Sequence, residues 1–141
     1  MLLRDKQVTS RTIVDNAENL LNHAPRRTEK IVADLEHPLP PTVVWPYDLI
    51  LCLFVCIHLQ EIEPICIEAS KLISPDGRML LLHHHERRTY IHEMPDQTFK
   101  IQTKHRRRDD IEEALSWAGW VYDTIDIDEY TKLYSCFPKK L

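Results

Sequence analysis

The chain has 141 residues, of which 43% are hydrophobic, and its formal net charge is −4 at pH 7. These values suit one folded domain with one core and exclude a chain that is disordered by composition. The negative charge argues against general affinity for nucleic acids or anionic membranes. No run approaches the about 18 apolar residues that a membrane-spanning helix needs, and Met1–Asp5 lacks the apolar core of a secretion signal.

The first third of the chain predicts an arm followed by two short strands. Residues 1–10 show no periodicity and are expected to form an N-terminal arm, with a single domain over 11–141. The segment 37–46 carries four prolines and predicts a loop, because proline cannot donate to a sheet. The predicted elements before this loop are the strand Arg11–Val14, the helix Asn16–Ala24 and the strand Glu29–Ala33.

A strand–helix–strand unit in the middle organises the chain. The apolar run Tyr47–Leu59 lacks alternation, which suits a strand buried on both faces of a parallel sheet. A helix with an apolar stripe follows, with Pro64 in its first turn, and continues to Ile73. Ser74–Gly77 predicts a turn and Arg78–Leu82 a second strand. Parallel neighbours need such a crossover helix.

The last third predicts a strand, a helix and a hairpin. Thr98–Thr103 alternates and predicts a strand or one arm of a hairpin. Asp109 is the predicted N-cap of a helix, with Glu112 completing a capping box, and Gly119 ends that helix. Two further alternating runs predict an antiparallel hairpin at one side of the sheet, Val121–Ile127 and Tyr130–Phe137.

These patterns together predict an α/β three-layer sandwich with a mostly parallel sheet and a C-terminal antiparallel hairpin. Asp48–Leu59 and Ala69–Leu82 resemble the fourth and fifth strands of class I S-adenosylmethionine-dependent methyltransferases, and Asp109–Trp120 resembles the helix that follows them. The resemblance runs from about Thr12 to the C-terminus. It implies a Rossmann-like methyltransferase fold with S-adenosylmethionine as cofactor, in which the first two predicted strands are the family's second and third.

The distribution of glycine departs from that family. Gly77 and Gly119 are the two glycines of the chain, whereas the family opens with a strand and a GxGxG loop that lets the backbone approach the cofactor closely. We therefore expect the first strand and this loop to be missing. A missing central strand would leave backbone groups unpaired at about 1–3 kcal/mol each. Either the second and fourth strands pair directly, or a partner protein or a second copy in a homo-oligomer completes the sheet.

The resemblance also implies a set of cofactor-binding residues. Asp15 matches the acid that holds the ribose hydroxyls, although a strand-end acid also caps a following helix. Asp34 and Leu35 match the pair that contacts the adenine, and a solvated loop acid is the alternative for Asp34. Cys52 and Leu53, near the end of the fourth strand, complete the implied set.

Histidines are the remaining candidates for chemistry. His58 follows the fourth strand and is either catalytic or a packed, hydrogen-bonded residue; no catalytic residue is assigned. Alternation sends His83 and His85 to one face of their strand, where they are a candidate metal pair with His58 or Glu86 as third ligand. The alternative is a polar strand end that opens on a pocket or solvent.

Two further groups have structural alternatives. The basic cluster Lys100–Arg108 suits phosphate binding or a solvated charged face. The cysteines lie in apolar contexts and are expected to be buried, reduced thiols, which favours a reducing, cytoplasmic location. They are Cys52, Cys56, Cys66 and Cys136.

Two functional hypotheses follow. In the first, the chain is a methyltransferase-like protein that is not independently active, because the glycine-rich loop is missing, or it is the incomplete half of a split or oligomeric enzyme. In the second, it is a non-catalytic interaction module whose exposed centre docks a partner. The sequence does not identify the methyl acceptor.

Overall fold

The computed structural model of the chain divides into two compact units, Met1–Val44 and Trp45–Leu141. It describes residues 8–85, 89–102 and 106–140. The expected single domain over 11–141 and the arm over 1–10 stay predictions, and residues 1–7 of that arm lie outside the described residues. Within the described ranges, no helix is long and apolar enough to cross a membrane.

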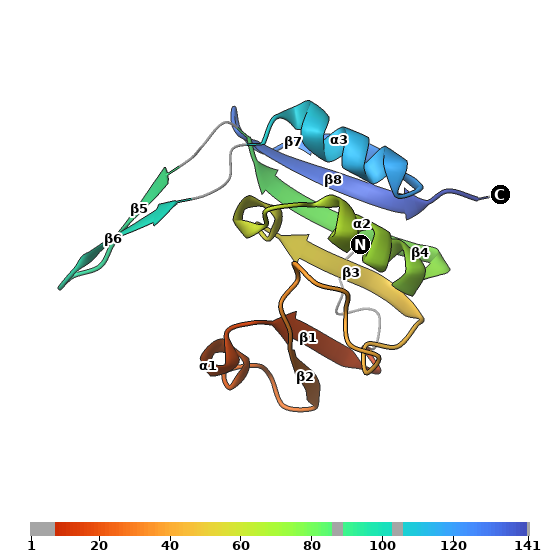
Figure 1. Cartoon of the computed structure of the whole chain (residues 1–141), viewed down its shortest axis with the longest axis horizontal. Helices are drawn as coiled ribbons and strands as arrows, with labels where there is room; N and C mark the ends of the chain where they lie inside the picture. Colours follow the sequence, from red (N-terminus) through yellow and green to blue (C-terminus); the bar gives the residue numbers. More distant parts are fainter. Residues whose placement is uncertain (1–7, 86–88, 103–105, 141) are drawn as a thin grey trace. The chain divides into compact units, whose positions relative to one another are not determined.

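The first unit contains a two-stranded parallel sheet (Figure 1). Strand β1 (Arg11–Asp15) pairs with β2 (Thr28–Val32), so both predicted strands are confirmed within a residue. Helix α1 (Glu18–Leu21) is shorter than predicted. Its N-cap residue, Ala17, offers no side-chain hydrogen bond, and a helix this short gains little from its own backbone bonds.

The second unit is built on a four-stranded sheet in the order β3-β4-β8-β7 (Figure 1). β3 and β4 are parallel, whereas β8 is antiparallel to both β4 and β7. The α/β class and the C-terminal hairpin are therefore confirmed, but the sheet is mixed rather than mostly parallel, because the hairpin returns β8 beside β4. The strands are β3 (Tyr47–Leu53), β4 (Ile73–His84), β7 (Trp120–Asp126) and β8 (Thr131–Pro138).

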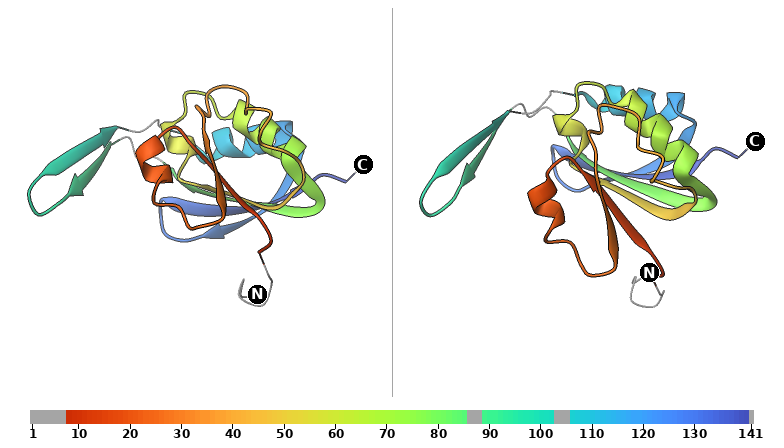
Figure 2. Two further views of the ribbon diagram at one scale, coloured as in Figure 1. Left: turned by 90° about the horizontal axis from the view of Figure 1, so that it is seen from below. Right: turned by 60° about the horizontal axis from the view of Figure 1, so that its bottom comes forward.

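Two helices, α2 (Glu63–Leu72) and α3 (Arg108–Trp117), lie on the same face of this sheet (Figure 2). The indole Nε1 of Trp120 in β7 donates to the carbonyl of Cys66 in α2 over 3.0 Å. We call this face the covered face; its buried strand residues include Cys52, Met79, Leu81, His83, Trp120, Lys132, Tyr134 and Cys136. The alternate residues form the opposite, open face, where Leu49, Leu51, Leu53, Val121 and Ile125 are exposed.

The predicted burial of the Tyr47–Leu59 run on both faces is therefore wrong. β3 ends at Leu53, and the chain leaves the sheet through Phe54, whose φ of 58° lies in the left-handed region. A short 3₁₀ helix, η2 (Cys56–His58), follows before α2. The leucines of β3 alternate with Cys52, and the helices cover the Cys52 side alone.

The predicted turn at Ser74–Gly77 is a bulge within the first part of β4. Ile73 pairs with Tyr47 and Arg78 pairs with Leu49, so β4 advances from 73 to 78 while β3 advances from 47 to 49. A Cβ on Gly77 would lie 2.7 Å from the Cδ1 atom of Ile73, so close packing requires glycine at this point.

Helix α3 begins earlier than the predicted capping box. Its N-cap is Arg107, whose N–H donates to the Oδ2 atom of Asp110 over 2.7 Å, so the box proposed for Asp109 and Glu112 is wrong. Gly119, with a φ of 86°, follows the end of the helix as predicted. Between β4 and α3, β5 (Thr89–Glu93) and β6 (Thr98–Gln102) pair as an antiparallel hairpin, which confirms the hairpin-arm interpretation.

We predict that Leu115→Ala lowers the free energy of unfolding by about 2–5 kcal/mol, because Leu115 is 0% exposed and its truncation leaves a cavity under α3. Trp117→Ala, on the same helix, is the matched control. Its side chain is 80% exposed, so its effect should stay within about 0.5 kcal/mol. Urea denaturation of both variants measures this difference. Equal losses would show that α3 does not pack on the sheet through Leu115.

Candidate functional site

Two acids lie at the carboxyl edge of the first unit's sheet. Asp15 ends β1, and Asp34 follows β2 by two residues. Because the two strands are parallel, their carboxyl ends meet at one edge, where the N–H of Ala33 donates to the carbonyl of Asp15 over 3.1 Å. The structure thus brings together the two acids that the sequence singled out.

Each acid also supports the turn that follows it. One carboxylate oxygen of Asp15 accepts from the N–H of Ala17 over 2.8 Å, just ahead of α1, and one oxygen of Asp34 accepts from Glu36 over 2.9 Å. Asp15 does not cap α1, whose N-cap is Ala17, so the capping alternative is wrong for Asp15. Asp34 is exposed, which fits its alternative as a solvated loop acid. Asp34 also lies 3.7 Å from the Nε2 atom of His37 in an exposed pair, and Leu35 is half-buried.

The other two predicted cofactor residues lie at the end of β3 in the second unit. Cys52 points into the covered face, where its thiol is hydrogen-bonded to Cys56, and this contact followed by burial raises the pKa of Cys52. A ligand at this edge would thus meet the backbone of Cys52 rather than its sulfur. Leu53 is exposed on the open face.

A polar cluster that the sequence analysis missed lies at the carboxyl ends of β3 and β4. The ring of Phe54 stacks on that of His84, with centroids 4.8 Å apart, and the N–H of Phe54 donates to Leu82 over 2.9 Å. The Nδ1 atom of His84 shares a hydrogen bond with the hydroxyl of Thr131. The strained backbone of Phe54 is thus held by contacts to β4.

An acid from the β7–β8 turn extends this cluster. The Oδ1 atom of Asp128 accepts from the N–H groups of Tyr130 and Thr131, each over 2.8 Å. The bond from Tyr130, followed by those from Thr131 and by the charge of His84, lowers the pKa of Asp128. The sequence held one signal for this cluster. Alternation along the strand places His84 on the face opposite to that of His83 and His85.

His83 and His85 share one side of β4, as alternation predicts, with ring centroids 5.0 Å apart. Both are buried on the covered side, so the expectation of a strand end opening on a pocket or solvent is wrong. The Nε2 atom of His85 lies 3.2 Å from the hydroxyl of Tyr134. Neither ring nitrogen of His83 has a hydrogen-bond partner among the described residues.

The arrangement does not make a metal site among the described residues, where no group of three His, Cys, Asp or Glu side chains is placed to hold an ion. Of the two proposed third ligands, Glu86 lies outside the described residues and His58 is exposed at the end of η2. The interpretation of His58 as a packed residue is therefore wrong, and its catalytic role stays a prediction.

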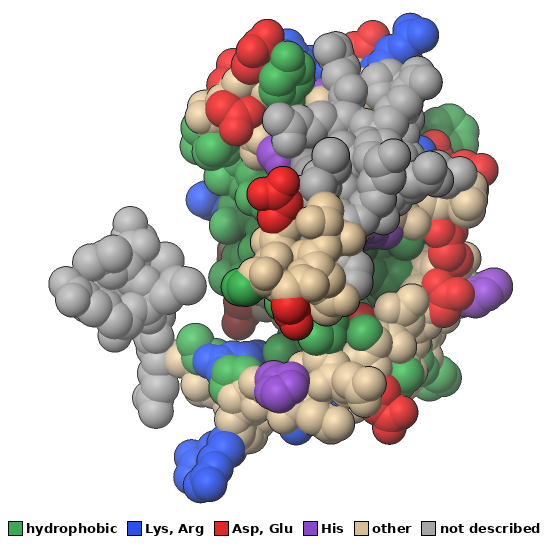
Figure 3. All heavy atoms as spheres, turned by 90° about the vertical axis from the view of Figure 1, so that its left-hand side faces the viewer, with side chains coloured by type: hydrophobic (Ala, Val, Ile, Leu, Met, Phe, Trp, Pro, Cys, Tyr) green, Lys and Arg blue, Asp and Glu red, His purple; other side chains and the backbone are tan. Residues whose placement is uncertain are grey.

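The basic cluster contains one arginine with a structural role. Half-buried Arg106 donates from Nε to the carbonyl of Cys56 over 3.2 Å, and from Nη2 to those of Leu59 and Gln60, the latter over 2.8 Å. The solvated-face interpretation is therefore wrong for Arg106, although Arg107 and Arg108 are exposed. On the side drawn in Figure 3, the described basic side chains are scattered among acidic ones. Three further basic side chains of the cluster lie outside the described residues, namely those of Lys100, Lys104 and His105.

The thiols are free and buried, as expected. The hydrogen bond from Cys52, with the charge of Arg106, lowers the pKa of Cys56 against the opposing effect of burial. Burial raises the pKa of Cys66, and it raises that of Cys136 to about 12. These last two thiols are therefore neutral packing groups near pH 7.

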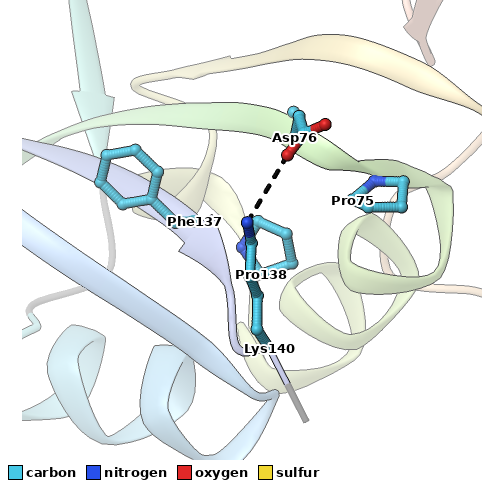
Figure 4. Close-up of a pocket in the computed structure, with 6 residues that line it drawn as sticks. Pro75, Asp76, Phe137, Pro138 and Lys140 are labelled. Atoms are coloured by element: carbon cyan, nitrogen blue, oxygen red, sulfur yellow. Dashed lines mark ion pairs between the residues drawn. The ribbon is translucent and has the colours of Figure 1, made fainter.

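A small hollow lies at the opposite end of the sheet from these clusters (Figure 4). Its volume is about 140 Å³, below the roughly 300–1,000 Å³ of small-molecule sites. Lys140 and Asp76 pair across it over 3.6 Å, but both side chains are well exposed, so the pair contributes little. Pro75, Gly77, Phe137 and Pro138 complete the lining.

Comparisons with solved structures identify the fold. An S-adenosylmethionine-dependent methyltransferase from Clostridium acetobutylicum matches with a TM-score of 0.74 and 11% identity over 93% of this chain and 76% of that one. One from Mesorhizobium loti matches with a TM-score of 0.72 and 13% identity over 94% and 82%. DhpI in complex with SAH matches with a TM-score of 0.65 and 14% identity over 94% and 68%.

The chain therefore has the fold of class I S-adenosylmethionine-dependent methyltransferases. Identities this low show the fold alone. No family profile matches the sequence. No curated protein matches it either.

The acids at the carboxyl edge of the first unit's sheet fit this cofactor in part. Carboxylates suit a ribose diol, and Asp15 and Asp34 are placed at the strand ends where open α/β sheets bind ligands. The methionine end of the cofactor needs a close backbone approach, and no glycine precedes Gly77 in the sequence.

We predict a pH effect from His83. Burial, followed by the charges of His85 and Arg106, lowers the pKa of His83 to about 3. In the unfolded chain the imidazole takes up a proton near its ordinary pKa of about 6.5. The unfolded state therefore binds this proton more tightly, and the stability from neutral His83 is complete above pH about 6.5 and is lost as the pH falls toward 3.

Between pH 7.5 and 5, the free energy of unfolding of the wild type should fall by about 2 kcal/mol because of His83. His83→Leu should not show this loss. Urea denaturation at both pH values measures the difference. His58→Leu, which removes an exposed imidazole, should follow the wild type. If His83→Leu loses as much stability as the wild type over this range, His83 is not held neutral in the folded chain.

Proposed function

We propose that this chain acts in S-adenosylmethionine-dependent methyl transfer and that these 141 residues are not active by themselves. The observation that carries the proposal is the methyltransferase fold over more than nine-tenths of the chain. S-adenosylmethionine, when bound, would supply the methyl group. A displacement of this kind depends mainly on proximity and alignment, so it requires few catalytic side chains.

The chain's own residues would hold the nucleoside part of the cofactor. Asp15 would accept hydrogen bonds from the ribose hydroxyls through its carboxylate, while the turn to Ala17 keeps that carboxylate oriented. Asp34 and half-buried Leu35 would contact the adenine from the end of β2. The cofactor contacts implied for Cys52 and Leu53, at the end of β3 in the second unit, stay predictions.

The dependence on a further segment follows from the glycine distribution. A loop whose backbone closely approaches the methionine part of the cofactor needs a glycine, because a Cβ would obstruct the approach. The first glycine of this sequence is Gly77, in the β4 bulge. We therefore propose that a partner protein or a second copy completes the cofactor site. The four free thiols support a reducing, cytoplasmic location.

A non-catalytic interaction module is the second candidate. The exposed leucines of β3 favour it, because an apolar sheet face suits docking whether or not a cofactor binds. The two candidates differ in whether the chain, once completed, binds the cofactor.

Titration calorimetry with S-adenosylhomocysteine tests the proposal. The isolated chain should show no saturable binding tighter than about 1 mM. A fusion that places the opening strand and glycine-rich loop of a methyltransferase ahead of Val8 should restore micromolar binding. In the fusion, Asp15→Asn should weaken that binding about tenfold through loss of a charge-assisted hydrogen bond.

Glu18→Gln, an exposed acid in α1, is the matched control and should leave the affinity unchanged. Micromolar binding by the isolated chain would overturn its dependence on a further segment. Absence of binding by a folded fusion would overturn the methyltransferase proposal and leave the interaction module.

A further inference from the structure

The open face of the four-stranded sheet is largely apolar. The strand register places its side chains in rows across all four strands. Leu51, Leu80, Ser135 and Asp123 form one row, and Leu53, Leu82, Leu133 and Ile125 form the next. Leu51 is 55% exposed and Ile125 is 54% exposed, at the two edges of the sheet. Nine-tenths of a core residue is normally hidden, so these side chains do not belong to a completed core.

The helices of this unit cannot cover that surface. α2 and α3 pack on the opposite face, where Leu115, Tyr134 and Cys136 are fully buried (Figure 2). Within this unit, the sheet therefore has one face that is covered by helices and one that is not. A sheet with an apolar face is stable when another layer buries it.

The size of the open face suits association with another protein surface. Four strands about 4.8 Å apart and seven residues of about 3.3 Å each span roughly 19 by 23 Å, or about 440 Å². Two such faces together present about 900 Å² of flat footprint, and side chains make the accessible area larger. The total therefore comes close to the about 1,000 Å² that a specific interface requires.

The charge of the open face suits a second copy. Its paired strand residues include one base, Arg78, and one acid, Asp123. The exposed Asp76 of β4 pairs with Lys140, so the face has little net charge although the whole chain carries −4. The guanidinium of Arg78 lies 4.5 Å from the ring centroid of Phe137, which keeps the cation against the sheet. An apolar, charge-poor centre is typical of interfaces between identical subunits.

We propose that a second copy of this chain packs its open face against the first, forming a dimer in which two four-stranded sheets lie face to face. Leu51 and Ile125 become buried in it, at the two edges of each sheet. The dimer requires no cofactor and does not depend on the proposed methyl transfer. It gives the sheet the second covering layer that its own helices leave out.

Sedimentation velocity over a concentration series tests the dimer. The wild type should shift from monomer to dimer as concentration rises. Leu51→Lys places a charge in the interface, at the β3 edge of the sheet, and should raise the dissociation constant at least about tenfold. Ile125→Lys, at the other edge of the sheet, should do the same. Both side chains are exposed in the single chain, so circular dichroism should show both variants folded.

Trp117→Lys is the matched control, because its side chain is more exposed than that of Leu51 but lies on α3, which belongs to the opposite side. It should leave the dissociation constant within about twofold of the wild-type value. A wild type that stays monomeric at every concentration would overturn the proposal. Growth beyond a dimer, or dissociation by Trp117→Lys but not by the two face variants, would also overturn it.

Discussion

The alternation of buried and exposed side chains along β3, β4, β8 and β7 governs the second unit. Successive residues of a strand point to opposite faces, so the register that buries Met79, Leu81 and Tyr134 under the helices also turns Leu80 and Leu133 outward. A one-residue slip would exchange the two sets and place Arg78 beneath α2 and α3. Both the covered-face and the open-face side chains are largely apolar, so a helical layer on one face leaves apolar side chains exposed on the other.

Much of this architecture could be predicted because its signals are local. Pro64 marks the start of α2, Gly119 marks the end of α3, and the alternating runs on either side of Asp128 form the C-terminal hairpin. These signals act over a few residues, and neighbouring segments do not change their meaning. The carboxyl-edge positions of Asp15 and Asp34 followed in the same way, from strands that are parallel.

The errors concern what lies above or beside an element. Leu51 and Cys52 are equally apolar in the sequence, yet one is exposed and the other buried, because coverage depends on helices distant in the chain. Arg106 could not be distinguished from its basic neighbours, since its partners are backbone carbonyls some fifty positions away. The His84 cluster depends on the return of β8 beside β4, which the expected mostly parallel sheet did not include.

The two proposals, a cofactor site completed by a further segment and an open face covered by a second copy, rest on features at two places in the structure. At the strand ends, acids suited to a nucleoside lie in a chain whose first glycine comes at position 77. Across the sheet, a layer that would bury the leucines of β3 comes from outside the elements of its unit. We propose that association with another protein surface completes both the core and the site, which would link the stability of the chain to its concentration.

Methyl NMR with a soluble nitroxide added as a paramagnetic probe tests the one-sided sheet most directly. We expect the methyl groups of Leu51, Leu53 and Ile125 to be broadened in dilute solution and protected at high concentration, while those of Leu81 and Leu115 stay protected throughout. Protection of the open face even at the lowest concentration would contradict this account, as would broadening that does not change with concentration.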